Sequence, residues 1–183
     1  MNYGDYKYTE DSLCLRLGRH YGIKRGLDCG PNIIMSQYKA DGEWVIATIM
    51  QDKHKMYSSF EYEADFLYIT KDRYLYEVEI KLSIADFRAD QQKTLYHNFP
   101  DVRGFYYCMP MELYAKHKEE VLRVCKEKDA GLIVESNEFK VIKKAPQRKS
   151  VEPLTDSRYL HYIRLFAKKW VRRRELIDGC NIK

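Results

Sequence analysis

The chain has 183 residues, 45% of them hydrophobic and 32% charged, and a net charge of +5 at neutral pH. This length and composition suit one globular domain and exclude a disordered or fibrous chain. No apolar run approaches the roughly 20 residues that span a bilayer, which excludes a membrane-spanning protein. The mild positive charge permits a phosphate-rich partner without requiring one.

The cysteines and the N-terminal residues indicate a compartment. The number of cysteines is odd, five, which fits a reducing cytoplasm better than a disulfide framework. None of them form a CxxC pair, so they do not indicate a zinc site. The chain begins with polar and acidic residues, unlike a secretory signal. We therefore expect a cytoplasmic protein with no membrane partner.

The first half of the chain predicts one helix followed by four strands. Thr9 to Ser12 has the residues of a helix start, and residues 13–22 continue with helical spacing of apolar side chains. Residues 28–31, DCGP, predict a break. We expect strands at 32–38, 44–50, 64–70 and 74–82, the last two joined as a hairpin by the polar turn at 71–73.

The second half alternates helices and strands. Ser83 is expected to cap a helix over 84–98, and Pro110 to begin a helix over 111–129. We expect strands at 103–109, 130–135 and 139–144, and a last helix at 157–177. The chain is thus predicted as a single domain of mixed α/β (α+β) class, with a core at about 9–144, a linker at 145–153 and a C-terminal helix at 154–178.

The strand YEVEIKL, residues 76–82, has an unusual face. Side chains alternate along a strand, so Val78, Ile80 and Leu82 share an apolar face. The opposite face then carries Glu77, Glu79 and Lys81. Two carboxylates and an ammonium group side by side are costly in a buried strand, so this face needs an explanation.

A metal site explains the face. Asp65 opens the preceding strand, and a hairpin brings its carboxylate beside that of Glu79. Clustered carboxylates repel one another unless a cation lies among them, and Mg²⁺ or Mn²⁺ prefers oxygen ligands. Asp65, Glu79 and the backbone carbonyl of Ile80 are the candidate ligands. Lys81 would orient or deprotonate an attacking water, or stabilise charge on a phosphate.

For an isolated ExK pattern, the usual interpretation is a solvent-facing strand with a cross-strand Glu–Lys pair. The arrangement favours a site instead: an acid on one strand, a short turn, ExK on a second strand, and then a helix.

This arrangement resembles the PD-(D/E)XK nuclease superfamily, with Asp65 as the first acid and Glu79-Ile80-Lys81 as the ExK. The longer stretch VEIKLSIADFRAD, residues 78–90, is similar to the signature of MmcB-type DNA repair proteins, and the likeness extends over about residues 60–174. The resemblance implies a restriction-endonuclease-like core of order α-β-β-β-α-β and Mg²⁺ or Mn²⁺ as cofactor. It also implies hydrolysis of phosphodiester bonds in DNA by an endonuclease, in repair or in phage or mobile-element DNA processing.

The resemblance also implies roles for single residues. Asp65 and Glu79 would ligate the metal, and Lys81 would be catalytic. Members often add an acid from the first helix, and Glu10 is the candidate, although helix capping explains it equally well. Glu77 departs from the apolar residue usual at its position, and is either a further ligand or the partner of a nearby base.

The helix after the motif carries further candidates. Gln92 and Tyr96 form a QxxxY spacing like that of RecB-type nucleases, where MmcB-type proteins tend to have a lysine at the first position. On a helix the two side chains would share one face and orient substrate, or form a surface polar pair. Arg88 and Lys93 are candidate nucleic-acid contacts, whereas His97 is interpreted as structural.

The last helix is basic. Lys168, Lys169, Arg172 and Arg173 are expected to be mostly exposed and to bind DNA phosphates, or to form a membrane-surface, partner-binding or solvated face. A homodimer is compatible with this reading, because a double-strand cut needs two sites. The alternative functions are a non-catalytic nucleic-acid-binding module with a nuclease-like fold and a protein-interaction subunit.

Overall fold

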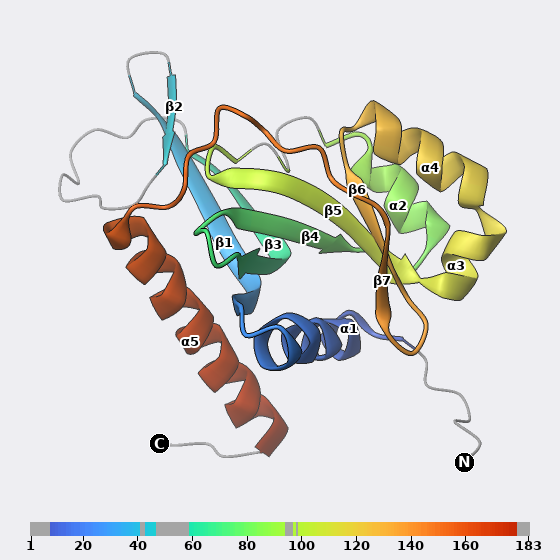
Figure 1. Cartoon of the computed structure of the whole chain (residues 1–183), viewed down its shortest axis with the longest axis horizontal. Helices are drawn as coiled ribbons and strands as arrows, with labels where there is room; N and C mark the ends of the chain where they lie inside the picture. Colours follow the sequence, from blue (N-terminus) through green and yellow to red (C-terminus); the bar gives the residue numbers. More distant parts are fainter. Residues whose placement is uncertain (1–7, 41–42, 47–58, 94–96, 98, 179–183) are drawn as a thin grey trace.

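The computed structural model describes residues 8–40, 43–46, 59–93, 97 and 99–178 (Figure 1). Its sheet has seven described strands in the order β2-β1-β3-β4-β5-β6-β7. These are β1 (Asp28–Ala40), β2 (Glu43–Ile46), β3 (Ser59–Ile69), β4 (Leu75–Ile80), β5 (Val102–Pro110), β6 (Gly131–Glu135) and β7 (Phe139–Lys143). Strand β5 runs parallel to β4 and β6, and the other pairs are antiparallel. The predicted mixed α/β class is confirmed.

The described helices follow the predicted order. They are α1 (Glu10–Gly18), which continues as the π-helical turn η1 (Arg19–Lys24), α2 (Ile84–Asp90), α3 (Met111–Lys116), α4 (Lys118–Glu127) and α5 (Asp156–Asp178). The single helix predicted over 111–129 is wrong in one respect, because the non-helical backbone of His117, with φ −128° and ψ 26°, divides it into α3 and α4. Among the described residues, no helix is long and apolar enough to cross a membrane.

Helix α1 covers one face of the sheet (Figure 1). It begins where the sequence predicts, because Thr9 and Ser12 form a capping box in which each side chain bonds the other's backbone amide. Leu13, Leu17 and Tyr21 then pack against the apolar side chains of the central strands, including Val78.

Helices α2, α3, α4 and α5 cover the opposite face. Helices α2 to α4 pack over β5 and β6, while Tyr162 and Phe166 of α5 pack over β1 and β3. A Cβ at Gly30 would lie 2.5 Å from the Phe166 ring, so this position on β1 needs glycine for the close approach of α5. Strand β4 lies between the two layers, and all six of its residues are buried.

Two local predictions differ from the structure. The predicted break at 28–31 is part of β1. Among the described residues, β2 pairs only with Gln37–Ala40, so Pro31 has a described strand neighbour on one side alone, and edge positions tolerate proline. Leu82 lies beyond the end of β4 and is 37% exposed instead of facing the core. Strand β2 agrees with the first part of the strand predicted at 44–50, and residues 47–50 lie outside the described residues.

Candidate functional site

The site lies where the regular sheet is interrupted at Asp65. Ala64 and Phe66 are two residues apart, yet Ala64 packs in the cluster under α5 and Phe66 in the cluster under α1. Strand alternation therefore breaks at Asp65. The register of β1 with β3 sets Asn32 opposite Asp65, and Asn32 has a left-handed φ of 50°. A break of this kind interrupts the backbone pairing of the strand and changes the direction of the side chain at that position, here Asp65.

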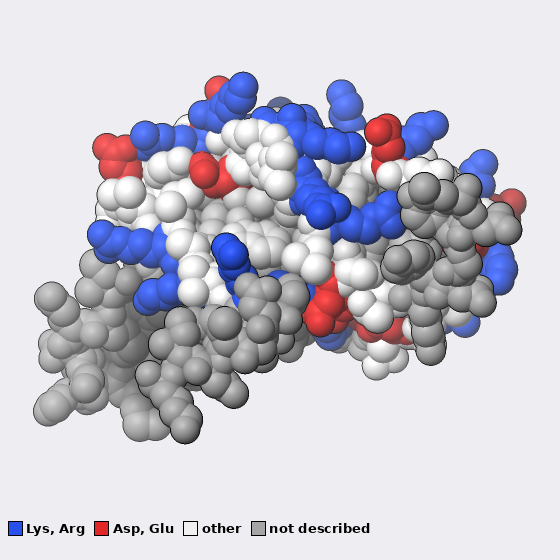
Figure 2. Space-filling view, turned by 90° about the horizontal axis from the view of Figure 1, so that it is seen from below, with Lys and Arg blue, Asp and Glu red and all other residues white. Residues whose placement is uncertain are grey.

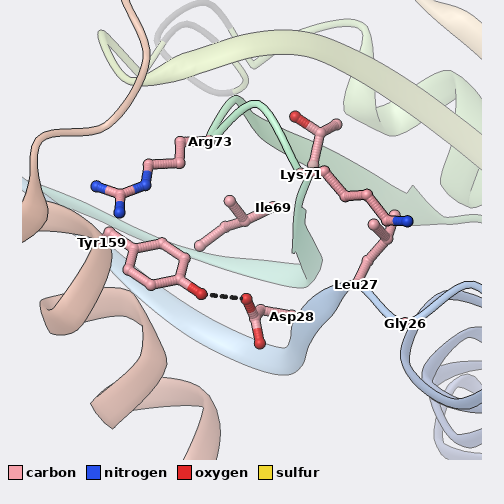
Figure 3. Close-up of a pocket in the computed structure, with 8 residues that line it drawn as sticks. Gly26, Leu27, Asp28, Ile69, Lys71, Arg73 and Tyr159 are labelled. Carbon is pink, nitrogen blue, oxygen red and sulfur yellow. Dashed lines mark hydrogen bonds between the residues drawn. The ribbon is translucent and has the colours of Figure 1, made fainter.

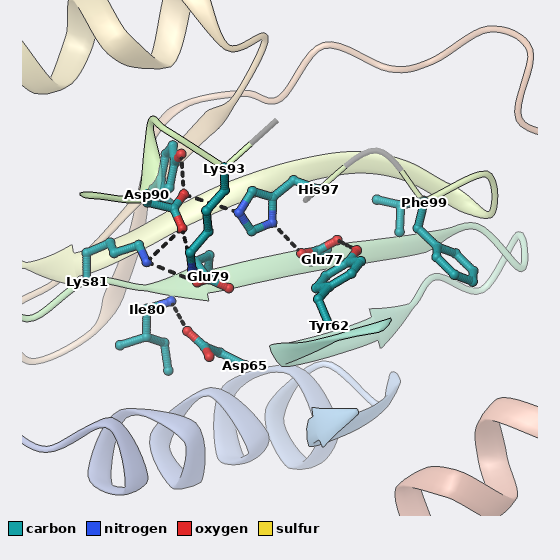
Figure 4. A network of polar contacts seen from close by, with 12 residues as sticks. Tyr62, Asp65, Glu77, Glu79, Ile80, Lys81, Asp90, Lys93, His97 and Phe99 are labelled. Atoms are coloured by element: carbon teal, nitrogen blue, oxygen red, sulfur yellow. Dashed lines mark hydrogen bonds and ion pairs between the residues drawn. The ribbon is translucent and has the colours of Figure 1, made fainter. Parts of the chain in front are cut away.

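Asp65 uses this freedom to bond the neighbouring strand. The pairing of β3 with β4 extends from Ile69 and Leu75 to Phe66 and Val78. Beyond it, the Ile80 amide donates a hydrogen bond to Asp65 Oδ2 at 2.7 Å. The half-buried carboxylate thus stands at the seam between the two strands, as the predicted hairpin requires (Figure 4).

Glu79 and Lys81 form the second part of the site. Lys81 Nζ donates to Glu79 Oε1 at 3.0 Å and to Asp90 Oδ1 at 3.2 Å. Glu79 is 5% exposed, and its second oxygen, Oε2, has no hydrogen-bond partner among the described residues. A buried carboxylate oxygen without a partner costs free energy, so this atom has unused capacity for a cation or a proton.

Glu77 and Asp90 are joined through His97 (Figure 4). His97 Nδ1 lies 2.6 Å from Glu77 Oε1, and its Nε2 lies 3.2 Å from Asp90 Oδ2. Tyr62 donates its hydroxyl to Glu77 at 2.7 Å, and Tyr107 donates to Asp90 at 2.8 Å. These five side chains are buried. Glu77 is therefore the partner of a base, one of the two alternatives for it.

The pKa values of the site follow from burial and these contacts. Burial, with the nearby charge of Glu79, raises the pKa of Asp65 to about 8. Burial opposes a charge on His97, but Glu77 and Asp90 raise its pKa to about 9. Burial likewise works against a charge on Lys81, but Glu79 and Asp90 hold the pKa of its ammonium above its usual range. Both bases are therefore cations at neutral pH.

Two sets of ligands are considered for a cation, one from the observed geometry and one predicted from the sequence. One ligand atom each from Glu77, Glu79 and His97 lies within 4.8 Å of the others. This set needs His97 to lose its proton and its bond to Glu77, because only a neutral imidazole ligates. The predicted set of Asp65 and Glu79 also requires a proton to leave, because burial and the charge of Glu79 raise the pKa of the Asp65 carboxyl to about 8. Glu79, with its free oxygen, belongs to both sets.

Glu10 is close to this site, as expected. Its charge contributes to the raised pKa of Asp65, and Asn32 Nδ2 donates to Glu10 Oε1 at 3.3 Å. Asp11, one residue on, instead pairs with Arg173 of α5. The ligand role of the Ile80 carbonyl stays a prediction, since the contact of Ile80 with Asp65 is made by its amide.

The helical QxxxY interpretation of Gln92 is wrong. Helix α2 is capped by Ser83 as predicted, but it ends at Asp90 and not near residue 98. Gln92 lies on the following turn, exposed, and Tyr96 lies outside the described residues. Beyond the end of α2, His97 has a left-handed φ of 63°, and its imidazole Nε2 lies 3.2 Å from Asp90 Oδ2.

The basic candidates on and after α2 already have partners within the chain. Arg88 forms two hydrogen bonds to Glu120 of α4, at 2.7 and 2.8 Å, instead of pairing with a strand acid. Lys93 Nζ lies 3.1 Å from Asp90 Oδ1. Their expected role in nucleic-acid binding therefore competes with these ion pairs.

The cations of α5 divide into two groups. Lys168 and Arg172 are exposed as predicted. The expectation of exposure is wrong for Lys169 and Arg173, which are half-buried because they point toward the body of the domain. Lys169 lies 3.8 Å from Glu63, and Arg173 donates to Asn32 at 3.1 Å.

The sequence interpretation missed the roles of His97, Asp90, Tyr62 and Tyr107. No short motif marks them, since Tyr62 and His97 reach Glu77 from 15 and 20 residues away. The available signal was Glu77 itself, because a carboxylate predicted in a buried strand needs a donor partner.

A surface pocket lies apart from this site, between β1, the β3–β4 turn and α5 (Figure 3). Its polar lining groups bond one another. Tyr159 donates to Asp28 at 2.6 Å, and Arg73 pairs with Asp156 and lies over the Tyr159 ring at 5.0 Å. These contacts occupy Tyr159, Asp28 and Arg73, and none of the site residues predicted from the sequence lines the pocket, so we do not assign it as the candidate site.

Comparisons with known proteins bear on the fold alone. No protein-family model matches this chain, and no curated protein matches it. A solved structure, the SPO1766 protein of unknown function from Silicibacter pomeroyi, is similar over 96% of this chain and 97% of that chain, with a TM-score of 0.55 and 18% sequence identity. The chain is thus a mixed α/β protein of a fold seen before, with a buried carboxylate, lysine and histidine site.

Proposed function

We propose that this protein is a metal-dependent nuclease that hydrolyses phosphodiester bonds of DNA with Mg²⁺ or Mn²⁺. The observation that carries the proposal is Glu79, whose buried Oε2 has no partner in the described part of the chain although Lys81 bonds its other oxygen. Asp65 stands on the next strand, within electrostatic reach. Two carboxylates and an ammonium group at one seam suit a divalent cation and a phosphate together.

The residues divide the chemistry between them. Asp65 and Glu79 would hold the metal, with Glu10 nearby as a further acid. The bound metal would lower the pKa of a water and offset charge on the phosphate. Lys81 is already protonated, so it would not accept a proton from the water. Its ammonium would donate to a phosphate oxygen and stabilise the charge that develops there.

The proposal includes the setting expected from the sequence resemblance. The enzyme would be an endonuclease of DNA repair or of phage or mobile-element DNA processing, and it would work in the cytoplasm. A homodimer would bring together two active sites, one for each strand of a DNA duplex.

One observation favours a second candidate, a non-catalytic DNA-binding module. The network already contains its own cations, because Lys81 and His97 bond three of the buried carboxylates, Glu77, Glu79 and Asp90. A site neutralised in this way has less need of a metal.

Calorimetric titration with Mn²⁺ separates the two candidates. We expect the wild type to bind Mn²⁺ and to cleave DNA, and Asp65→Ala and Glu79→Ala to lose binding and at least about 100-fold in cleavage rate. Glu119→Ala, which removes an exposed carboxylate of α4, is the matched control and should behave as wild type. Retained cleavage in Glu79→Ala would refute the site. DNA binding without Mn²⁺ binding or cleavage in the wild type would favour the module.

A further inference from the structure

Helix α5 carries three outward cations in one row. Arg164, Lys168 and Arg172 are each four residues apart, so they lie on one side of the helix over about 12 Å. All three are exposed. Within the part of the chain that the structure describes, none of the three forms an ion pair or a hydrogen bond. We call this set the outer row.

The neighbouring cations serve a different purpose. Lys169 and Arg173, the inner row, follow one residue after Lys168 and Arg172 and contact Glu63, Asn32 and Asp11. They fasten α5 to β3, β1 and α1. Stability of the fold therefore accounts for the inner row, whereas nothing within the described chain uses the charge of the outer row.

We propose that the outer row binds the phosphate backbone of DNA and leads it toward the candidate site. The proposal rests on the proposed function for the identity of the substrate. Residues 164–172 include no acidic residue, so the row is a continuous positive strip. Cations repeated at a fixed spacing suit a partner with repeated negative charge, and one DNA strand advances about 3.4 Å per phosphate along the helix axis. The row therefore spans three to four nucleotides, roughly.

A lipid surface fits this face less well. Helices that lie on membranes place large apolar and aromatic residues on the side that enters the lipid. The aromatic residues Phe166 and Trp170 of α5 instead pack inward against the sheet and α1. The large apolar residues exposed on its described part, Leu160 and Val171, are 11 positions apart.

The row ends beside the candidate site. Arg173, the residue after Arg172, pairs with Asp11 in the first turn of α1. Glu10, the candidate acid of the site, is the residue before Asp11. Trp170 packs on Gly18 of the same helix, so the C-terminal part of α5 lies against α1. Figure 2 views the side on which α1 and the end of α5 lie in Figure 1, and more Lys and Arg than Asp and Glu side chains are visible on it.

The test measures binding of a short fluorescent DNA duplex in EDTA over a range of salt concentrations. We expect the triple variant Arg164→Gln/Lys168→Gln/Arg172→Gln to lower the affinity at least about 10-fold. The slope of log affinity against log salt should fall by roughly 2 to 3, because each lost phosphate contact removes about 0.9. The matched control Lys116→Gln/Lys118→Gln/Lys126→Gln removes three exposed charges from α3 and α4 and should leave the slope unchanged.

Each outcome decides the proposal. An equal loss of DNA affinity in both triple variants would show a general effect of charge and overturn the proposal. A wild type that binds anionic vesicles but not DNA would also overturn it. An unchanged slope in the outer-row variant would also overturn it, even if the wild type cleaves DNA. If the outer row carries binding but the wild type never cleaves, this inference stands and the nuclease proposal fails.

Discussion

At the scale of single residues, buried charge defines the site. Asp65 holds the seam between β3 and β4 with a carboxylate whose pKa burial and Glu79 raise to about 8. A metal ligand must be deprotonated before it binds. Proton release should therefore accompany metal binding at this site.

We expect Mn²⁺ affinity to rise with pH up to about 8, by as much as about tenfold per unit for one released proton. Calorimetry at about pH 6.5 and about pH 8, in buffers of different ionisation enthalpy, measures both the affinity and the protons released. Asp65→Asn is the control, because it removes the titrating carboxyl: it should bind Mn²⁺ much more weakly, and any binding that its amide oxygen still supports should not depend on pH in this range. Equal wild-type affinity at the two pH values would contradict the assignment of Asp65 as a ligand.

At the scale of elements, α1 links the N-terminal residues to the site. Its first turn carries Glu10, and its capping box has hydrogen bonds of 3.1 Å from Ser12 N to Thr9 Oγ1 and from Thr9 N to Ser12 Oγ. The cap satisfies amides that the helix itself leaves unpaired.

Thr9→Ala should lower the free energy of unfolding by about 1 kcal/mol, because it removes one partner of the capping box. For a chain of this size that corresponds to a fall of about 2–4 °C in Tm by calorimetry. Ser150→Ala, at an exposed position before α5, is the control and should leave Tm unchanged. The same Tm for Thr9→Ala and wild type would mean that the first turn of α1 adds nothing to global stability.

At the scale of the whole molecule, the buried network couples stability to pH. His97 has an ordinary pKa of 6.5, which its contacts raise to about 9 in the fold, and Asp65 is raised from 3.8 to about 8. Both groups bind protons more tightly when folded. The stability that they contribute is therefore full below their unfolded pKa values and is lost as pH rises through the folded values.

We expect the free energy of unfolding in EDTA to fall between about pH 6.5 and about pH 9, by roughly 3 kcal/mol for His97 alone. Urea titrations at three pH values in this window measure it. His97→Gln should be less stable at the lowest pH and should show a smaller dependence on pH, because the titrating imidazole is gone. A wild-type slope no steeper than that of His97→Gln would contradict a charged His97 in the fold.

Local pattern in the sequence was sufficient for much of the fold and for half of the site. The alternation in YEVEIKL predicted that Glu77, Glu79 and Lys81 share a face, and the short turn at 71–73 predicted the hairpin that sets Asp65 beside them. Capping residues predicted where α1 and α2 begin. Each of these features depends on neighbours within a few residues, which the sequence displays directly.

The partners of the buried charges were decided by the tertiary structure. His97 bonds Glu77 from a position beyond the end of α2, which stops at Asp90. The way in which α5 packs on the domain places Arg173 against Asn32 and leaves Arg172 exposed. The sequence by itself determined which residues form helices and strands and which side chains share a face, because dihedral preference and periodicity are local. Only the tertiary structure determined which charge neutralises which, because burial removes water and leaves each buried charge to the side chains that packing brings within reach.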